Sequence, residues 1–557
     1  MEARPSPQRR PKGSLSGKVR EALRVCAPPA LGLLGITGCS ESPPARASAP
    51  SPPVEVVVRA PEAKPQEAAA SQDLPAIALA PKKPPSASEP KPAPTGGARI
   101  YSKARFAWIY PSPKRSDAWL GYVSLGGSVP LKGGSAEAAR ILGGKGCDAW
   151  YAVEPRGFMC AGSAATLDPN DPVVVALSRD AADVSSPWPF KYGESIGAPR
   201  YPRLPTREQQ RSTEWDLDEH LELVAKAKAA PDPETVAAIS KDLVGIDFSP
   251  AGQAPPELLD FGPLIREGRK SIAKASTIAF TREFDVDGRT FLQTADHAFI
   301  PKDRVKPYPR SDFQGIELGG DVALPIAFFR RRERPKFKRA ESGELVASGE
   351  NWSARSWVAL TGEEIKQGDK TFFATREPGI FASADDATVV RAVTEAPFLR
   401  AGADAAERGR ATWLDISVLG GWLVAYEGLK PVFVTLISPG RGGIPKPGVD
   451  PLSTASTPVG RFRIDGKFKT ATMVSSTDEN VVHTEVQFIQ NFSGPHALHA
   501  AYWHASWGDP KSGGCVNLSP IDARRLFEWS EPRVPEGWHG LRATKDFGLS
   551  TEVVLHR

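Results

Sequence analysis

Near the C-terminal end of the sequence, a cysteine stands in a setting that suits acyl transfer. Its neighbours are small or polar: Ser512, Gly513, Gly514 and Asn517. A thiol attacks a carbonyl carbon as the thiolate, so Cys515 needs a nearby base or a lowered pKa. A histidine on a neighbouring strand, such as His499 sixteen residues upstream, can take the proton. Glycines beside the thiol let backbone N–H groups approach a developing oxyanion, because no Cβ blocks them.

The other cysteines make this one unusual. The chain has five, and Cys26 and Cys39 belong to its N-terminal segment. Cys147 and Cys160 are thirteen residues apart in a predicted strand-turn-strand, and in an exported protein we expect them to form a disulfide. The alternative is two buried free thiols. Cys515 is then left without a partner, which points to a reactive thiol.

The N-terminus predicts export. Residues 1–24 contain seven Lys or Arg and only two Glu, and a short apolar run follows, ending in Ile-Thr-Gly-Cys at 36–39. This pattern is typical of a secretory signal. It resembles the lipobox of bacterial lipoproteins, which implies cleavage before Cys39, lipidation of that residue and a periplasm-facing anchor, with Ser40 favouring the outer membrane. A disordered basic N-terminus is the alternative.

The C-terminal residues 405–557 resemble the L,D-transpeptidase (YkuD-type) catalytic domain. The resemblance rests on "TPVGRF", "ALHAAYWH" and "SGGCVNLSPIDARRLFEW". The family pattern has a His-Gly, a spacer, and Ser/Thr-His-Gly-Cys with Arg or Asn two residues on. The resemblance implies a β-sandwich-like fold and a thioester between the cysteine and a peptidoglycan stem peptide. The attack falls on the L-centre of meso-diaminopimelate and expels D-alanine, and an amine then takes the acyl group.

The resemblance also implies roles for individual residues. Cys515 is the nucleophile and His499 the general base, while Gly514 and Cys515 supply N–H groups to the oxyanion. Ser512 and Asn517 shape the site. Two positions depart from the family: Gly513 replaces its histidine and Ala500 replaces its glycine. His504 could fill part of the missing imidazole's role, or could simply pack between Trp503 and Trp507; His496 and His539 are read as structural.

The remaining sequence predicts a mainly β, multi-domain protein. The expected parts are a lipoprotein signal (1–39), a Pro/Ala-rich tether (40–97), an SH3-like β module (98–175), a linker with a helical insert (176–285), β-rich modules that resemble SH3-like domains (286–404) and the catalytic domain (405–557). Thr-Phe-x-x-Thr recurs at 290–294 and 371–375. Thr206 and Asp232 are the predicted N-caps of the insert, and Ser519 that of a helix near the C-terminus.

Charge and composition reduce the range of possible binding partners and cofactors. The net charge of +5 equals the excess in residues 1–24, so the body is close to neutral and gives no support to nucleic-acid binding. No metal or organic cofactor is implied; His220 and His297 are expected to be packing or surface residues. Two alternatives stay open: a non-catalytic peptidoglycan-binding wall anchor, and an L,D-carboxypeptidase that uses water as the acceptor.

Overall fold

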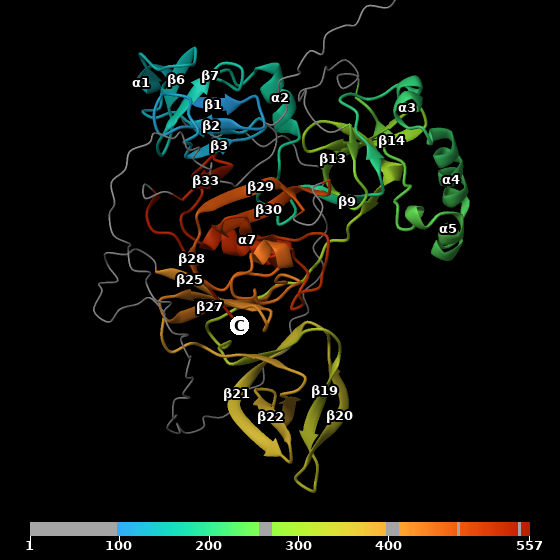
Figure 1. The fold of residues 1–557 in the computed structure, drawn as a ribbon, viewed down its shortest axis with the longest axis vertical. Helices are drawn as coiled ribbons and strands as arrows, with labels where there is room; N and C mark the ends of the chain where they lie inside the picture. Colours follow the sequence, from blue (N-terminus) through green and yellow to red (C-terminus); the bar gives the residue numbers. More distant parts are fainter. Residues whose placement is uncertain (1–96, 256–269, 397–410, 476–479, 544–546) are drawn as a thin grey trace, which may run out of the picture. The chain divides into compact units, whose positions relative to one another are not determined.

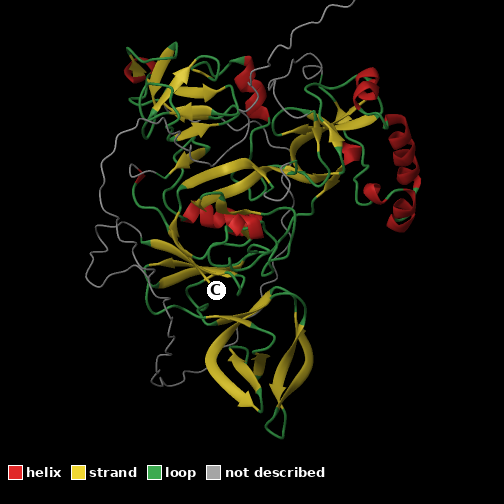
Figure 2. Cartoon of the chain, viewed as in Figure 1, coloured by secondary structure: helices red, strands yellow, loops and turns green. Residues whose placement is uncertain are grey.

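The chain is mainly β, with several sheets and few helices (Figures 1 and 2). The computed structural model describes residues 97–255, 270–396, 411–475, 480–543 and 547–557. The predicted signal, Cys39 and the tether to residue 96 lie outside the described residues. Within the described part of the chain, no helix has the length and apolar character needed to span a bilayer.

The first module is built from short aromatic and β-branched runs separated by Gly and Pro. Its strands are β1 (Arg99–Ser102), β2 (Ala107–Ile109), β3 (Gly121–Val123), β4 (Ser128–Pro130), β5 (Arg140–Ile141), β6 (Ala149–Ala152), β7 (Phe158–Ala161) and β8 (Ala165–Thr166), with helices α1 (Ala136–Ala139) and α2 (Pro172–Arg179). A disulfide joins Cys147 to Cys160. Its apolar core also takes in Trp538 and Leu541 from the C-terminal part of the chain.

A second group of strands carries the helical insert. The strands are β9 (Lys191–Ser195), β10 (Ala198–Pro199), β11 (Gly252–Gln253), β12 (Ser271–Ile272), β13 (Thr277–Val286), β14 (Arg289–Thr294), β15 (Phe299–Pro301) and β16 (Val305–Pro307), with the short helix η2 (Lys302–Arg304). The helix predicted from Thr206 forms as two, α3 (Arg207–Thr213) and α4 (Leu217–Ala229), followed by α5 (Pro233–Ile239) and η1 (Lys241–Leu243). Thr206 and Asp232 cap α3 and α5 as predicted.

A seven-stranded sheet follows. It contains β18 (Ile326–Phe329), β19 (Arg334–Arg339), β20 (Leu345–Trp352), β21 (Ser356–Gln367), β22 (Lys370–Thr375), β23 (Ile380–Ser383) and β24 (Thr388–Val390). The repeated Thr-Phe-x-x-Thr falls on β14 and β22, which belong to different sheets. The expected boundary at 175/176 falls inside α2, and that at 285/286 falls inside β13, whose hairpin with β14 crosses it.

The C-terminal domain encloses the largest described apolar cluster between two sheets. One sheet has the order β17 (Ile316–Glu317), β27 (Lys430–Leu436), β26 (Trp422–Glu427), β25 (Thr412–Ser417), β34 (Glu552–His556), β28 (Gly460–Arg463). The other contains β29 (Gly466–Val474), β30 (Val482–Ser493), β31 (His496–Ala500), β32 (Val516–Leu518) and β33 (Gly540–Arg542). A short 3-10 helix, η4 (Pro451–Thr454), precedes β28.

One helix helps to close this core. Helix α7 (Pro520–Trp529) packs against β30 and β31 (Figure 1). Ser519 caps it as predicted, with its hydroxyl accepting from the Asp522 N–H, and Leu526 and Phe527 are buried. The helix therefore backs the strands that carry the histidine and cysteine positions.

The sheet that contains β29 and β30 continues beyond the C-terminal domain. Strand β33 pairs with β3 of the first module, and β30 meets β13 at the pair Thr277 and His483. Tyr192 of β9 stacks on Tyr502, just beyond β31, with ring centroids 3.8 Å apart. Residues far apart in sequence therefore support the strand that carries His499.

Candidate active site

Two short parallel strands bring the predicted site residues together. His499 in β31 pairs in register with Asn517 in β32, and Cys515 immediately precedes β32. Residues two apart on a strand project from the same face, so Cys515 and Asn517 start on the face that carries His499. All three positions lie over a core that excludes water, since Leu498, Ala500, Val516 and Leu518 are fully buried.

The turn before Cys515 is held by one hydroxyl. Ser512 Oγ accepts the Gly514 N–H at 3.1 Å and donates to the Cys515 carbonyl at 2.5 Å. Gly514 has φ +132°, and a Cβ there would lie 2.9 Å from the Ser456 carbonyl oxygen. Only glycine fits this position without strain. The Gly514 N–H is bound to Ser512 here, and its role as an oxyanion donor stays a prediction.

The Cys515 thiol is half-buried and protonated at neutral pH. Its Sγ donates a long hydrogen bond to the Pro495 carbonyl, at 3.8 Å. Burial raises the pKa of the thiol to about 11, although a hydrogen bond from the Ala497 backbone lowers it in part. A pKa this high leaves the group as the thiol at pH 7, so attack on a carbonyl requires a base that removes the proton during the reaction.

A chain of hydrogen bonds fixes the proton positions on His499. His504 Nδ1 accepts the Ser506 N–H at 3.2 Å, so its Nε2 carries the hydrogen that it donates to Asn517 Oδ1 at 3.2 Å. The Asn517 amide then donates from Nδ2 to His499 Nε2 at 3.1 Å, and His499 Nδ1 donates to the Ala500 carbonyl at 2.9 Å. In this series of hydrogen bonds every donor faces an acceptor. The bond from Asn517 and the bond to the Ala500 carbonyl both require the His499 tautomer with its hydrogen on Nδ1.

His499 is therefore a neutral imidazole whose basic nitrogen is Nε2. Burial, together with repulsion from His483 and His504, lowers its pKa to about 4. The ring can accept a proton at neutral pH. In the described residues, however, no hydrogen bond joins Nε2 to the Cys515 sulfur, because the Asn517 amide occupies that nitrogen. Proton transfer requires the amide to move aside or a group of the substrate to bridge the two.

A second histidine, read from sequence as structural, also borders the cysteine turn. A Cβ on Gly514 would lie 3.0 Å from His496 Nε2, and the His496 ring is buried. Burial lowers its pKa, so this ring too is neutral at pH 7. The alternation of β31 gave no signal for this placement, because His496 and His499 differ by three positions and so leave a regular strand on opposite faces.

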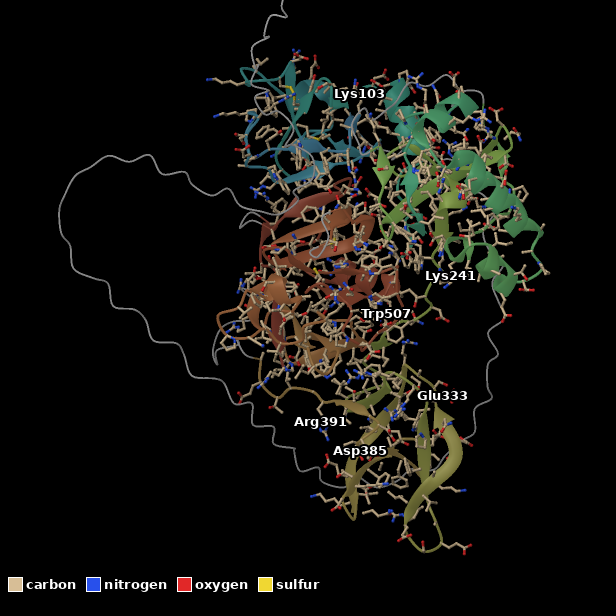
Figure 3. The ribbon with its side chains drawn as sticks, turned by 45° about the vertical axis from the view of Figure 1, so that its right-hand side comes forward. Lys103, Lys241, Glu333, Asp385, Arg391 and Trp507 are labelled. Carbon is tan, nitrogen blue, oxygen red and sulfur yellow. A yellow bond between two sulfur atoms is a disulfide. The ribbon has the colours of Figure 1, made fainter. Side chains whose placement is uncertain are left out.

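Aromatic rings pack around the histidines. Trp507, buried in the loop between β31 and β32 (Figure 3), has its ring centroid 4.8 Å from that of His504. Trp503 stacks on His483 at 4.4 Å and lies 5.9 Å from His499. His504 thus both packs against tryptophan and takes part in the hydrogen-bond chain. Gly513 is half-buried, with no side chain to supply the imidazole that the family pattern has there.

The described residues contain no cluster of three or more His, Cys, Asp or Glu side chains that could hold a metal ion. His220, in α4, is buried and paired with Asp303 at 3.1 Å. His297, in the turn between β14 and β15, is buried beside Gln293. Both sit in packed surroundings away from the cysteine turn.

Comparison with known proteins identifies this domain. Residues 413–539 match the model of the YkuD L,D-transpeptidase catalytic domain. No curated protein sequence matches the chain. Similar solved structures include an L,D-transpeptidase from Xylanimonas cellulosilytica (20% identity, 27% of this chain and 61% of that one, TM-score 0.19) and a mutant L,D-transpeptidase from Enterococcus faecium (19%, 27% and 50%, TM-score 0.20).

Another similar structure is an L,D-transpeptidase from Mycobacterium smegmatis, at 14% identity over 40% of this chain and 77% of that one, with a TM-score of 0.20. The match spans less than two thirds of the first two structures, and TM-scores this low carry no argument about the whole chain. The assignment rests on the family model, whose matched range contains the β31–β32 pair and the cysteine turn. Residues 413–539 are a YkuD-family L,D-transpeptidase catalytic domain.

Proposed function

We propose that this protein is a peptidoglycan L,D-transpeptidase that uses Cys515 as nucleophile and His499 as general base. The observation that carries the proposal is the hydrogen-bond chain from His504 through Asn517 to His499. It leaves His499 neutral, with Nε2 as the basic nitrogen and on the same strand face as the only described free thiol. A neutral thiol and a neutral imidazole form a suitable pair for concerted deprotonation and attack.

The proposed reaction has two half-reactions. Cys515 attacks the carbonyl of the L-centre of diaminopimelate in a stem tetrapeptide, its proton passes to His499 Nε2, and the terminal D-alanine leaves as the amine after taking that proton. An acceptor amine then attacks the thioester and releases the thiol. We propose that the Cys515 and Gly514 N–H groups stabilise the oxyanion, the latter after leaving Ser512, and that the Asn517 amide is a further donor when it is displaced from Nε2.

Muropeptide dimer formation tests the proposal. Wild type and three variants, Cys515→Ser, His499→Gln and His496→Gln, are incubated with a purified disaccharide-tetrapeptide, and products are separated by mass spectrometry. We expect Cys515→Ser to fall to background and His499→Gln to lose about 10²–10⁴-fold. His496→Gln should lose much less. A deficit larger for His496→Gln than for His499→Gln would reverse the assignment of the base.

A wall anchor without catalysis is the second candidate, and one feature favours it. Burial raises the pKa of the Cys515 thiol to about 11, and no described hydrogen bond joins it to an imidazole. Intact-mass measurement after exposure to a carbapenem separates the two. A mass increase that is lost in Cys515→Ser supports the enzyme. An unreactive thiol in a protein that still sediments with peptidoglycan supports the anchor.

The acceptor separates a transpeptidase from an L,D-carboxypeptidase. With an amine acceptor the product is a cross-linked dimer, whereas water gives a tripeptide. Both appear in the same mass spectrum, so one assay reports the ratio of the two products. We propose the amine, because the family model that matches residues 413–539 is that of L,D-transpeptidases.

The cellular setting is also a proposal. We propose that the mature chain begins at a lipidated Cys39 and that residues 40–97 tether the folded body to a membrane of the cell envelope, with the SH3-like modules as its spacer. The basic, apolar and Gly-Cys pattern of residues 1–39 supports this. Mass spectrometry of the N-terminal peptide checks it: an unmodified Met1 would exclude lipidation at Cys39.

A further inference from the structure

A cavity outside the catalytic domain has the features of a ligand site. It has a volume of about 310 Å³ and lies on the β9–β13–β16 part of the sheet. Its floor is apolar, since Phe280, Leu292 and Val305 are buried there. Nothing in the hydrogen-bond chain of the cysteine site involves it.

One wall of the cavity is lined by three ion pairs that share charged groups. Lys191 Nζ lies 2.9 Å from Glu283, Lys302 Nζ lies 2.9 Å from Glu283, and Lys302 also lies 2.9 Å from Asp247. The two cations and two carboxylates neutralise one another. This wall therefore offers paired donors and acceptors, which suit hydroxyl and acetamido groups, and adds no net charge.

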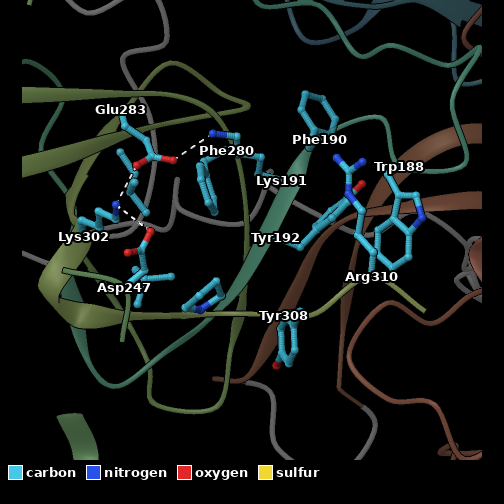
Figure 4. Close-up of a pocket in the computed structure, with 13 residues that line it drawn as sticks. Trp188, Phe190, Lys191, Tyr192, Asp247, Phe280, Glu283, Lys302, Tyr308 and Arg310 are labelled. Carbon is cyan, nitrogen blue, oxygen red and sulfur yellow. Dashed lines mark hydrogen bonds and ion pairs between the residues drawn. The ribbon is translucent and has the colours of Figure 1, made fainter. Parts of the chain in front are cut away.

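The opposite wall is aromatic and carries one unpaired cation. Figure 4 shows Trp188 and Arg310 together, across the cavity from the ion-pair row, with Tyr192 and Tyr308 between them. The Arg310 guanidinium lies 5.8 Å from the Trp188 ring centroid. Arg310 is exposed and has no acidic partner among the described residues, so the cavity as a whole is positive by one charge.

We propose that this cavity binds an acidic amino sugar of a glycan strand, with the pyranose ring on Trp188 and its carboxylate on Arg310. The less polar face of a pyranose, lined by C–H groups, packs on aromatic rings, and a guanidinium takes a carboxylate in a bidentate contact. The paired wall can then receive the ring's hydroxyl and acetamido groups. A sugar ring and one substituent fit a cavity of about 310 Å³.

The position of the cavity connects it to the proposed reaction, and this part of the inference rests on the proposed function. Tyr192 of the cavity stacks on Tyr502 at 3.8 Å, and Tyr308 lies 5.9 Å from the same ring. Tyr502 follows His499 by three residues. A glycan held in the cavity would therefore be anchored against the segment that positions the base, while its stem peptide serves as the donor or acceptor.

Calorimetric titration of the full-length Cys515→Ser chain tests the cavity without turnover. The probes are N-acetylglucosaminyl-N-acetylmuramic acid, which carries a free lactyl carboxylate, and chitobiose, which has the rings but no carboxylate. We expect tighter binding of the acidic disaccharide. Trp188→Leu should weaken both probes about tenfold, and Arg310→Gln should abolish the preference between them.

Two controls keep the result unambiguous. Arg332→Gln removes an exposed arginine of the seven-stranded module and should change neither affinity. Thermal unfolding of each variant shows whether a loss of binding reflects a loss of fold, and Trp188→Phe, which keeps a ring, should retain binding. Equal affinities for Trp188→Leu and the parent, or an unchanged preference in Arg310→Gln, would overturn the proposal. Carbapenem acylation of wild type reports the proposed function separately.

Discussion

At the scale of single residues, the described free cysteine is a weak acid. Burial raises the pKa of Cys515 to about 11, above the ordinary value of a free thiol. The thiolate is the form that reacts with electrophiles and oxidants, so its very small fraction at neutral pH keeps Cys515 unreactive in the absence of a base.

The pH dependence of alkylation follows directly. Thiolate is the form that reacts with iodoacetamide, and with a pKa near 11 its fraction rises about tenfold per pH unit between pH 7 and 10. We expect the labelling rate of Cys515 to increase over this whole range. A plateau near pH 8.5, measured by mass spectrometry, would show that the thiol has an ordinary pKa. A model thiol peptide run beside it is the control.

The orientation of one amide determines which nitrogen of His499 is basic. Asn517 donates to His499 Nε2 only because His504 donates to its carbonyl oxygen. In Asn517→Asp, a carboxylate faces Nε2 and requires a hydrogen there, which removes the lone pair needed for catalysis. We expect acylation to fall by about 10²-fold or more, while Asn517→Ala loses less.

The supporting role of His504 has its own readout. His504→Gln keeps an N–H donor toward Asn517, whereas His504→Phe keeps only the packing against Trp507. We expect His504→Gln to retain more acylation than His504→Phe. Nitrogen-15 chemical shifts of His499 should show hydrogen on Nδ1 in wild type and a mixture of tautomers in His504→Phe. Equal activities of the two variants would limit His504 to packing.

Much of this site could be predicted from sequence, and the exceptions have physical reasons. A sequence motif can specify the positions of Cys515, His499 and Asn517. The structure shows His499 and Asn517 in contact. The occupied Gly514 N–H depends on a serine rotamer, and the place of His496 depends on an irregular strand end. A sequence pattern reports neither rotamers nor local departures from strand pairing.

At the scale of elements, a buried ion network attaches the helical insert to the sheet. Arg289 in β14 contacts Glu214, between α3 and α4, at 2.7 Å and Asp303 in η2 at 2.8 Å. Arg304 also reaches Glu214 and Asp216. The caps of α3 and α5 can be predicted from the sequence. The long-range ion pairs cannot, because the charge of a residue does not indicate which distant residue it will contact.

Removing the central arginine should release the insert. Arg289→Leu removes the closest cation from the buried carboxylates of Glu214 and Asp303, which keep only the longer contacts with Arg304 and His220, and we expect a loss of about 3–5 kcal/mol. Hydrogen exchange of residues 207–229 should rise accordingly. The matched control is Arg211→Leu, which removes an exposed pair with Asp218 at 3.3 Å and should cost less than about 1 kcal/mol. Equal exchange in the two variants would contradict this account.

At the scale of the whole molecule, the catalytic domain contributes to the core of another module. Trp538 is fully buried among residues of the first module, and its Nε1 donates to the Glu154 carbonyl at 2.9 Å. Strand β33 pairs with β3 beside it. The expected division at 404/405 rests on where the family resemblance begins, and that resemblance carries no information on the packing of Trp538 and Leu541 against the first module.

Replacing this tryptophan should destabilise both parts. Trp538→Ala removes a buried indole and a hydrogen bond, so we expect a loss of about 3–5 kcal/mol in urea unfolding. Trp215→Ala, at a side chain that is 92% exposed, serves as the matched control and should change stability little. A Trp538→Ala protein as stable as wild type would show that the two parts fold independently.

Acid should also destabilise the catalytic domain. Burial lowers the pKa of His483, His499 and His504 to about 4 in the folded chain, below the usual 6.5 of an unfolded histidine. The unfolded state therefore binds more protons, so stability falls as pH drops from about 6.5 to 4, by up to about 1.4 kcal/mol per pH unit for each ring. Melting temperatures at pH 7 and 5 measure this, and His483→Phe should weaken the dependence.

The junction between β13 and β30 is short. The two strands share one register pair, Thr277 with His483, and side-chain hydrogen bonds of Ser276 and Thr484 add to it, whereas β29 and β30 pair along most of their length. Force applied across the junction would be carried by these few bonds and by the Tyr192–Tyr502 stack. We therefore expect β13 to separate from β30 at a lower pulling force than the one that opens the β29–β30 pair.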